Sequence, residues 1–134
     1  MAFNTVGAVS INRTHEILSS VFHIPLATGT IKNMVTRCAE SLKDTYEQIR
    51  LKMITLGLIH CDETGSRVDG KTCWVHVASD QNYTYLTINQ KRGQAGMDAA
   101  NVLPHANGII MHDCWSSYWK YQNVTHAICC AHIL

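Results

Sequence analysis

The sequence predicts an α/β fold in which a mixed β-sheet follows a helical arm. Three observations favour this class. The spacing of apolar residues changes from about 3.6 to 2 after Gly57, which indicates a change from helix to strand. Residues 68–71 (VDGK) contain the Asp-Gly dipeptide that is typical of tight hairpins. Two short apolar runs, residues 58–62 and 108–113, each end on an aspartate.

The length and composition of the chain exclude several classes of protein. A chain of 134 residues, 46% of them hydrophobic and 16% charged, is long enough for one domain with its own core. The net charge of +1 excludes a strong overall basic field. No apolar run is long enough to span a bilayer and no signal-peptide core is present, so we expect a cytoplasmic protein without a membrane partner. None of the six cysteines forms a Cys-x-x-Cys pair, which favours buried free thiols.

Residues 1–57 are predicted to form a helical N-terminal segment. A short helix is expected over residues 14–22, before Pro25, and a long helix over about 30–56, where apolar residues recur at steps of three and four. Gly57 is the expected stop. Two interpretations stay open: a helix-turn-helix that grips DNA, or an arm that packs on the next domain. Residues 30–56 carry five Lys/Arg against three Asp/Glu, a weak excess for DNA binding.

Residues 58–134 are predicted to form the sheet. Strands over 58–62, 72–79 and 83–88 have short connections and should be antiparallel. A helix around 94–103 precedes the run at 108–113, which favours a strand parallel to the first, and residues 125–130 suggest a fifth strand. This is the plan of a ribonuclease-H-like sheet. Because the chain runs out after AHIL without a capping glycine or polar tail, we expect the core to be incomplete at its C-terminal end.

The two strand-end aspartates suggest one shared site. If the first and fourth strands are neighbours, Asp62 and Asp113 lie at adjacent strand ends, about 5 Å apart across the sheet. Two close carboxylates repel each other unless a cation lies between them, and Mg²⁺ takes such hard oxygen ligands. Two ions of this kind would activate a water and stabilise the leaving oxygen of a phosphodiester.

Several short motifs, in order and spacing, match one family. They are DETG at 62–65, VDGK at 68–71 with the Trp-Val pair at 74–75, KRG at 91–93, HDCWSSY at 112–118 and CAH at 130–132. Over residues 28–134 the chain resembles the central domain of the insertion-sequence-66 transposases. The resemblance implies a ribonuclease-H-like fold and an Asp-Asp-Glu site that uses Mg²⁺ or Mn²⁺ to cut and join DNA. Asp62 and Asp113 would be the first two acids, and the third would lie beyond residue 134.

Other side chains have two interpretations each. Lys91 and Arg92 would contact DNA phosphates or form a solvated turn. Glu63 has the chemistry of a metal ligand, but a strand points it to the face opposite its neighbour Asp62. The cluster of His126, Cys129, Cys130 and His132 has the atoms for zinc without the spacing of a common zinc finger. Aromatic side chains over 115–121 would stack on bases or pack under the sheet edge.

The sequence therefore predicts a fragment of a transposase catalytic domain that acts on transposon ends and target DNA. Without a third acid, we expect the fragment to be inactive alone. The alternative is a non-catalytic remnant that binds DNA or a full-length transposase subunit through its helical arm. A third possibility is a small zinc-binding module.

Overall fold

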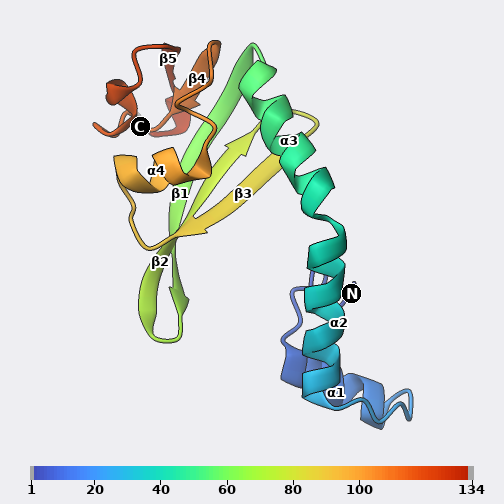
Figure 1. Cartoon of the computed structure of the whole chain (residues 1–134). Coiled ribbons are helices and arrows are strands. Elements are labelled where there is room, and N and C mark those ends of the chain that lie inside the picture. The colour runs from blue at the N-terminus through green and yellow to red at the C-terminus, as the bar shows by residue number, and fades with distance from the viewer. Residues whose placement is uncertain (1, 133–134) are drawn as a thin grey trace. The chain divides into compact units, whose positions relative to one another are not determined.

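The computed structural model describes residues 2–132 (Figure 1), and the chain divides between Asp44 and Thr45 into two compact units. The predicted segments, in contrast, divide after residue 57, directly before the first strand begins at Leu58. In the described part of the chain, no helix is both long enough and apolar enough to cross a membrane.

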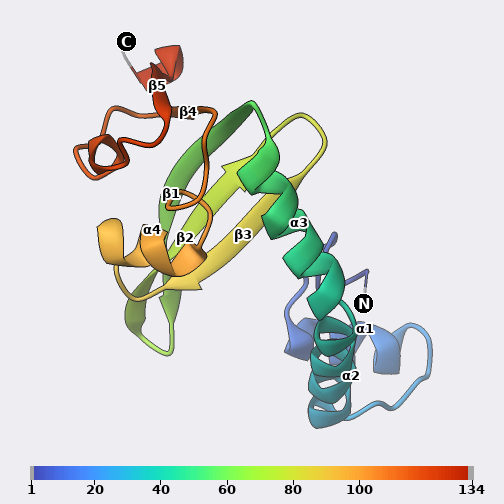
Figure 2. The same ribbon diagram turned by 45° about the horizontal axis from the view of Figure 1, so that its top comes forward.

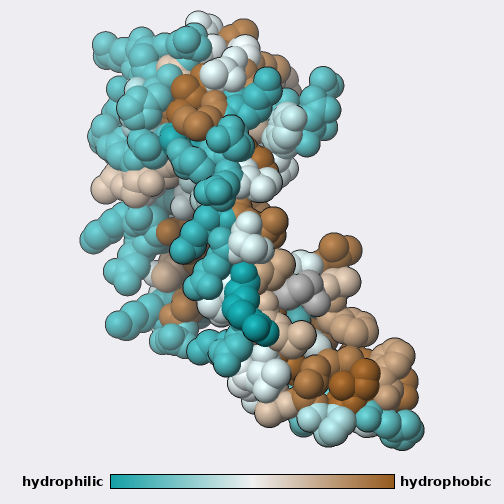
Figure 3. All heavy atoms as spheres, turned by 45° about the vertical axis from the view of Figure 1, so that its right-hand side comes forward, coloured by the Kyte–Doolittle hydropathy of each residue, from teal (hydrophilic) through white to brown (hydrophobic). Residues whose placement is uncertain are grey.

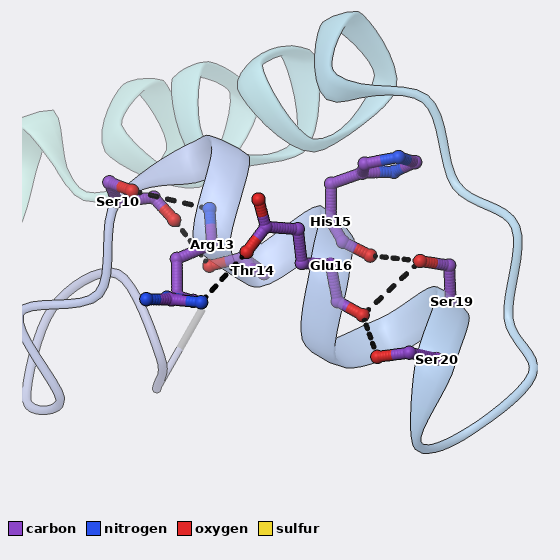
Figure 4. A network of polar contacts seen from close by, with 7 residues as sticks. All are labelled: Ser10, Arg13, Thr14, His15, Glu16, Ser19 and Ser20. Carbon is purple, nitrogen blue, oxygen red and sulfur yellow. Dashed lines mark hydrogen bonds and ion pairs between the residues drawn. The ribbon is translucent and has the colours of Figure 1, made fainter.

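The first unit contains helices α1 (Ile11–Ser20) and α2 (Thr28–Ser41). Helix α1 begins three residues before the predicted start because the Ser10 hydroxyl accepts a hydrogen bond from the Arg13 amide and caps the first turn (Figure 4). The Ser19 and Ser20 hydroxyls bond to backbone carbonyls one turn back. The helix therefore satisfies much of its polar surface within itself.

The segment that follows α1 leaves large apolar side chains in solvent. Val21, Phe22 and Ile24 are 65%, 55% and 44% exposed. In the space-filling view of Figure 3, hydrophobic residues (brown) form patches on the surface. Thr14 and Ile31 are the buried members of α1 and α2. The unit thus has a small core and a large apolar surface.

The predicted long helix over residues 30–56 is wrong in one respect, because it is interrupted. Helix α2 ends at Ser41, and helix α3 (Lys43–Thr55) begins two residues later. Leu42 leaves helical geometry with φ −98° and ψ 2°, and its amide bonds to the carbonyls of Ala39 and Glu40. The Ser41 hydroxyl also donates to the Cys38 carbonyl at 2.8 Å, a local bond that competes with the helical ladder.

The second unit is built on a five-stranded mixed sheet in the order β3-β2-β1-β4-β5 (Figures 1 and 2). Its strands are β1 (Leu58–Val68), β2 (Lys71–Ser79), β3 (Thr84–Asn89), β4 (Ile109–His112) and β5 (Thr125–Ile128). β1, β2 and β3 pair antiparallel, whereas β4 is parallel to both β1 and β5. These pairings confirm the predicted ribonuclease-H-like arrangement of three antiparallel strands followed by parallel ones.

The hairpin between β1 and β2 confirms the Asp-Gly prediction. Asp69 and Gly70 have φ values of 49° and 74°, and Val68 pairs with Lys71 across them. Left-handed geometry at both central residues gives the turn the twist that flanking strands need. The paired strands run farther than expected, since β1 continues six residues past Asp62 to Val68.

One face of the sheet is covered and carries the core. Met53 of α3 and Met97 of α4 (Gln94–Ala100) pack in one cluster with Ile59 of β1 and Ile110 of β4. Helix α4 lies against β2 and β3 (Figure 2). Burial of these side chains is the main favourable contribution to folding of this unit.

The other face, which we call the open face, has no described helix packed on it in the same way. Its apolar residues Leu58, Leu86, Ile88 and Ile109 are between 40% and 53% exposed. Burial alternates along β1: Ile59, Cys61 and Glu63 are buried, and the residues between them are exposed. This alternation separates the two faces of the sheet.

Close backbone approach fixes where β4 begins. The Ile109 amide bonds to the Gly57 carbonyl at 2.8 Å. A Cβ on Gly108 would lie 2.6 Å from the Leu56 carbonyl oxygen, so only glycine fits there without a shift. The short 3₁₀ helices η1 (Tyr118–Lys120) and η2 (Cys130–His132) flank β5.

Candidate functional site

The register of β1 and β4 sets the positions of the two predicted acids. His60 pairs with Met111 in this parallel ladder, and Asp62 and Asp113 each lie two residues farther along. Adjacent strands lie about 4.8 Å apart. Asp62 is exposed between buried Cys61 and Glu63, and Asp113 follows buried His112. The register therefore brings both aspartates to the same edge of the sheet, and Asp62, in phase with the exposed residues of β1, lies on the open face.

The backbone changes direction directly after Asp113. β4 ends at His112, and Cys114 has φ 71°, a conformation that costs a non-glycine residue free energy. Two hydrogen bonds compensate for this cost: the Cys114 amide donates to His112 Nδ1 at 3.1 Å, and the Trp115 amide donates to Asp113 Oδ1 at 2.9 Å. The turn thereby orients the Asp113 carboxylate.

Each aspartate keeps one carboxylate oxygen available. Asp62 Oδ1 accepts from the Glu63 amide at 2.8 Å, and Asp113 Oδ1 from the Trp115 amide. Within residues 2–132, neither Oδ2 has a hydrogen bond or an ion-pair partner. Free carboxylate oxygens at the end of a parallel strand pair suit a hard divalent cation.

A metal ion is the group that the family resemblance implies, and the donors fit it in part. Asp62 and Asp113 provide two hard oxygen donors on one edge. Over the described residues, however, no group of three or more His, Cys, Asp or Glu side chains is arranged to hold an ion. The pair is therefore a partial donor set.

Glu63 lies on the covered face and has a different role from its neighbour. Its side chain has no exposed area, and it accepts a hydrogen bond from the Tyr118 hydroxyl at 2.6 Å. Arg92 Nε donates to Glu63 Oε1 at 3.0 Å, and Arg92 Nη2 forms an ion pair with the same oxygen at 2.9 Å. Burial, followed by this bond to Glu63, raises the pKa of the Tyr118 hydroxyl. Glu63 is thus a compensated buried charge.

Of the two predicted DNA contacts, Arg92 has partners inside the unit. Its guanidinium lies 4.2 Å from the ring centroid of Trp115 and 4.8 Å from that of Trp74, distances typical of cation–π contacts. The Lys91 side chain is exposed, while its backbone carbonyl contacts His76 Nε2 at 3.1 Å. The two neighbouring cations therefore face different surroundings.

Two histidines form a hydrogen-bonded chain beneath β4 and β5. Because His112 Nδ1 accepts from the Cys114 amide, its Nε2–H donates to His126 Nδ1 at 3.0 Å, and His126 Nε2–H donates to the Tyr121 carbonyl at 3.0 Å. Burial, and then the neighbouring His126, lowers the pKa of His112. His126, one of the candidate zinc ligands, thus has both ring nitrogens engaged.

Sequence reasoning missed both buried polar networks. The alternation that predicted strand β1 also carries the signal for Glu63, because it puts this acid in phase with the buried Ile59 and Cys61. Burial raises the pKa of the Cys61 thiol to about 12, so this cysteine stays protonated. No short-range pattern pairs Glu63 with Arg92, which is 29 positions away.

Comparison with known families supplies the remaining observation. Residues 4–134 match the family described as "Transposase IS66 family". The chain belongs to this family. The match covers nearly the whole sequence and confirms the resemblance found in the motifs, including the segments that contain Asp62 and Asp113.

This IS66-family chain resembles individual known proteins only weakly. No curated protein matches it. A chain of a solved structure, a simian T-cell lymphotropic virus intasome in complex with PP2A regulatory subunit B56 gamma, is similar with 14% identity and a TM-score of 0.43. The similarity covers 54% of this chain and 31% of that one, so the chain spans less than a third of its length.

Proposed function

We propose that this chain supplies part of a transposase catalytic core, in which Asp62 and Asp113 bind Mg²⁺ or Mn²⁺ and act on DNA phosphodiesters. The single observation that carries the proposal is the β1·β4 register, which brings two strand-end carboxylates to one edge of an IS66-family fold. A divalent cation held there would activate a water and stabilise the leaving oxygen.

The residues of the chain would contribute position and charge. The Asp113 carboxylate is oriented by the Trp115 amide, and the Asp62 carboxylate by the Glu63 amide, which leaves one oxygen of each for a cation. DNA would approach the edge of the sheet at which the two strands that carry these acids end. The exposed Lys91 is the better candidate for a phosphate contact, because Arg92 already binds Glu63.

We further propose that these 134 residues have little activity by themselves. A two-ion site needs more donors than two carboxylates, and misalignment alone costs about 100-fold in rate. Supercoiled plasmid DNA incubated with the chain and Mg²⁺ or Mn²⁺ should show little or no nicking. Robust nicking that is lost in D62N and D113N, but kept in the exposed hairpin control D69N, would show that the two acids suffice.

The alternative is a non-catalytic protein that binds DNA or a transposase subunit. The exposed apolar side chains at Val21, Phe22 and Ile24 favour a protein partner for the helical arm. The two proposals differ in metal dependence. Binding of a labelled DNA duplex that is strengthened by Ca²⁺ and weakened in D62N supports the catalytic core, whereas metal-independent binding that D62N leaves unchanged supports the alternative.

A further inference from the structure

On the covered face, a chain of contacts joins the strand that carries Asp62 to the turn that carries Asp113. It begins at Glu63, whose amide donates to Asp62 Oδ1 and whose buried carboxylate binds Arg92. It ends at Trp115, whose amide donates to Asp113 Oδ1. Arg92 connects the two ends, because its guanidinium lies 4.2 Å from the Trp115 ring while it binds Glu63 at 2.9 Å.

Arg92 is itself held by its own turn. The Lys91 amide donates to Asn89 Oδ1 at 2.8 Å, and the Lys91 carbonyl contacts His76 Nε2 at 3.1 Å. His76 is the cross-strand partner of Glu63 on β2. The backbone that presents Arg92 is therefore fixed to the same pair of strands as the carboxylate that Arg92 binds.

A second contact supports the same turn. Tyr118 donates to Glu63 Oε2 at 2.6 Å, and its ring stacks on His112 at 4.6 Å. His112 directly precedes Asp113 in sequence. Side-chain contacts on the covered face therefore hold the chain on both sides of this aspartate, at His112 through Tyr118 and at Trp115 through Arg92. A flat guanidinium that donates through a fork and also stacks on a ring cannot be replaced in geometry by an ammonium.

From this arrangement we propose that Arg92 is a positioning residue for the Asp62–Asp113 pair. It acts through Trp115 and Glu63 and does not touch the metal. The proposal rests on the proposed function for its consequence, which is tighter metal binding, but its geometry is present without metal. Supporting residues of this kind typically change metal affinity by about 10- to 100-fold.

The test compares R92K and W115F with the control R67K, an exposed arginine on β1. R92K keeps the charge but loses the fork and the stacking, and W115F keeps the backbone amide but shortens the ring. Two quantities are measured at a temperature where melting curves show all variants folded. They are the amide exchange rate of residue 115 without metal, and the dissociation constant for Mn²⁺.

We expect faster exchange at residue 115 in both R92K and W115F, and Mn²⁺ binding about 10-fold weaker, with R67K like the unchanged chain. A brace that is merely structural would lower the melting temperature and leave both quantities unchanged, which would overturn the proposal. If the unchanged chain binds no Mn²⁺, the proposed function fails, and the exchange rate of residue 115 alone decides whether Arg92 positions this turn.

Discussion

Asp62 and Glu63 are neighbours in sequence, yet they lie on opposite faces of one strand in opposite surroundings. Glu63 has no exposed side-chain area and is bound by Arg92 and Tyr118. Asp62 is exposed, and its carboxylate accepts a hydrogen bond from the amide of the next residue. The same carboxylate chemistry therefore stabilises the fold on the covered face and remains available for binding on the open face.

This contrast separates a structural acid from a candidate ligand on physical grounds. A buried carboxylate must be paired, because an uncompensated buried charge costs several kcal/mol. An exposed carboxylate carries little of that cost and can exchange water for a cation. The following experiments test the contrast, beginning with the largest expected effect.

Replacing the carboxylate by an amide at the two neighbouring positions should have unequal effects on stability. E63Q leaves the Arg92 guanidinium without its anion and should lower the free energy of unfolding by about 3 kcal/mol, the lower end for broken buried pairs, since Arg92 is 41% exposed. D62N should change it by no more than about 0.5 kcal/mol. Urea unfolding measures both, and equal losses would contradict the separation of the faces.

The hydroxyl of Tyr118 should account for a smaller share of the same network. Y118F removes the donor to Glu63 while Arg92 stays bound, so we expect a loss of about 1.5 kcal/mol in the free energy of unfolding. The matched control Y83F alters an exposed tyrosine and should change stability by less than about 0.5 kcal/mol. If both substitutions have the same effect, Tyr118 is not a significant partner of Glu63.

The burial of His112 predicts that the free energy of unfolding depends on pH, and we expect this effect to be smaller than those of E63Q and Y118F. Its pKa is lowered in the folded state, mainly by burial, so below about 6.5 the unfolded chain binds a proton that the folded chain resists. The contribution of neutral His112 to the free energy of unfolding should therefore be fully present above this pH, and should be lost as the pH decreases below 6.5. Urea unfolding at pH 5 to 8 should give a shallower fall for H112N than for the unchanged chain; identical slopes would refute this.

The exposed apolar residues of the open face predict association rather than instability. I88T replaces a side chain that is 53% exposed, and should change the free energy of unfolding by less than about 0.5 kcal/mol. It should nevertheless reduce binding of a hydrophobic dye and the fraction of oligomers in sedimentation. A monomeric unchanged chain that binds no dye would contradict an exposed apolar face.

Local patterns predicted the sheet well and the networks poorly. Alternation along residues 58–62, the Asp-Gly turn and the crossover before β4 each depend on near neighbours, so they predicted the strand order and the shared edge of Asp62 and Asp113. The pairing of Glu63 with Arg92 and Tyr118 depends on contacts 29 and 55 positions apart. The break at Leu42 escaped prediction because apolar periodicity continues through it.

The central claim is that Asp62 and Asp113 hold one divalent cation together, and a double-mutant cycle on Mn²⁺ affinity tests it most directly. The dissociation constant is measured for the unchanged chain, D62N, D113N and the double variant, with D69N as an exposed control. If the two acids share an ion, each single variant should lose most of the affinity and the double variant little more. Losses that multiply as independent factors, or affinity that D62N and D113N leave unchanged, would contradict a shared site.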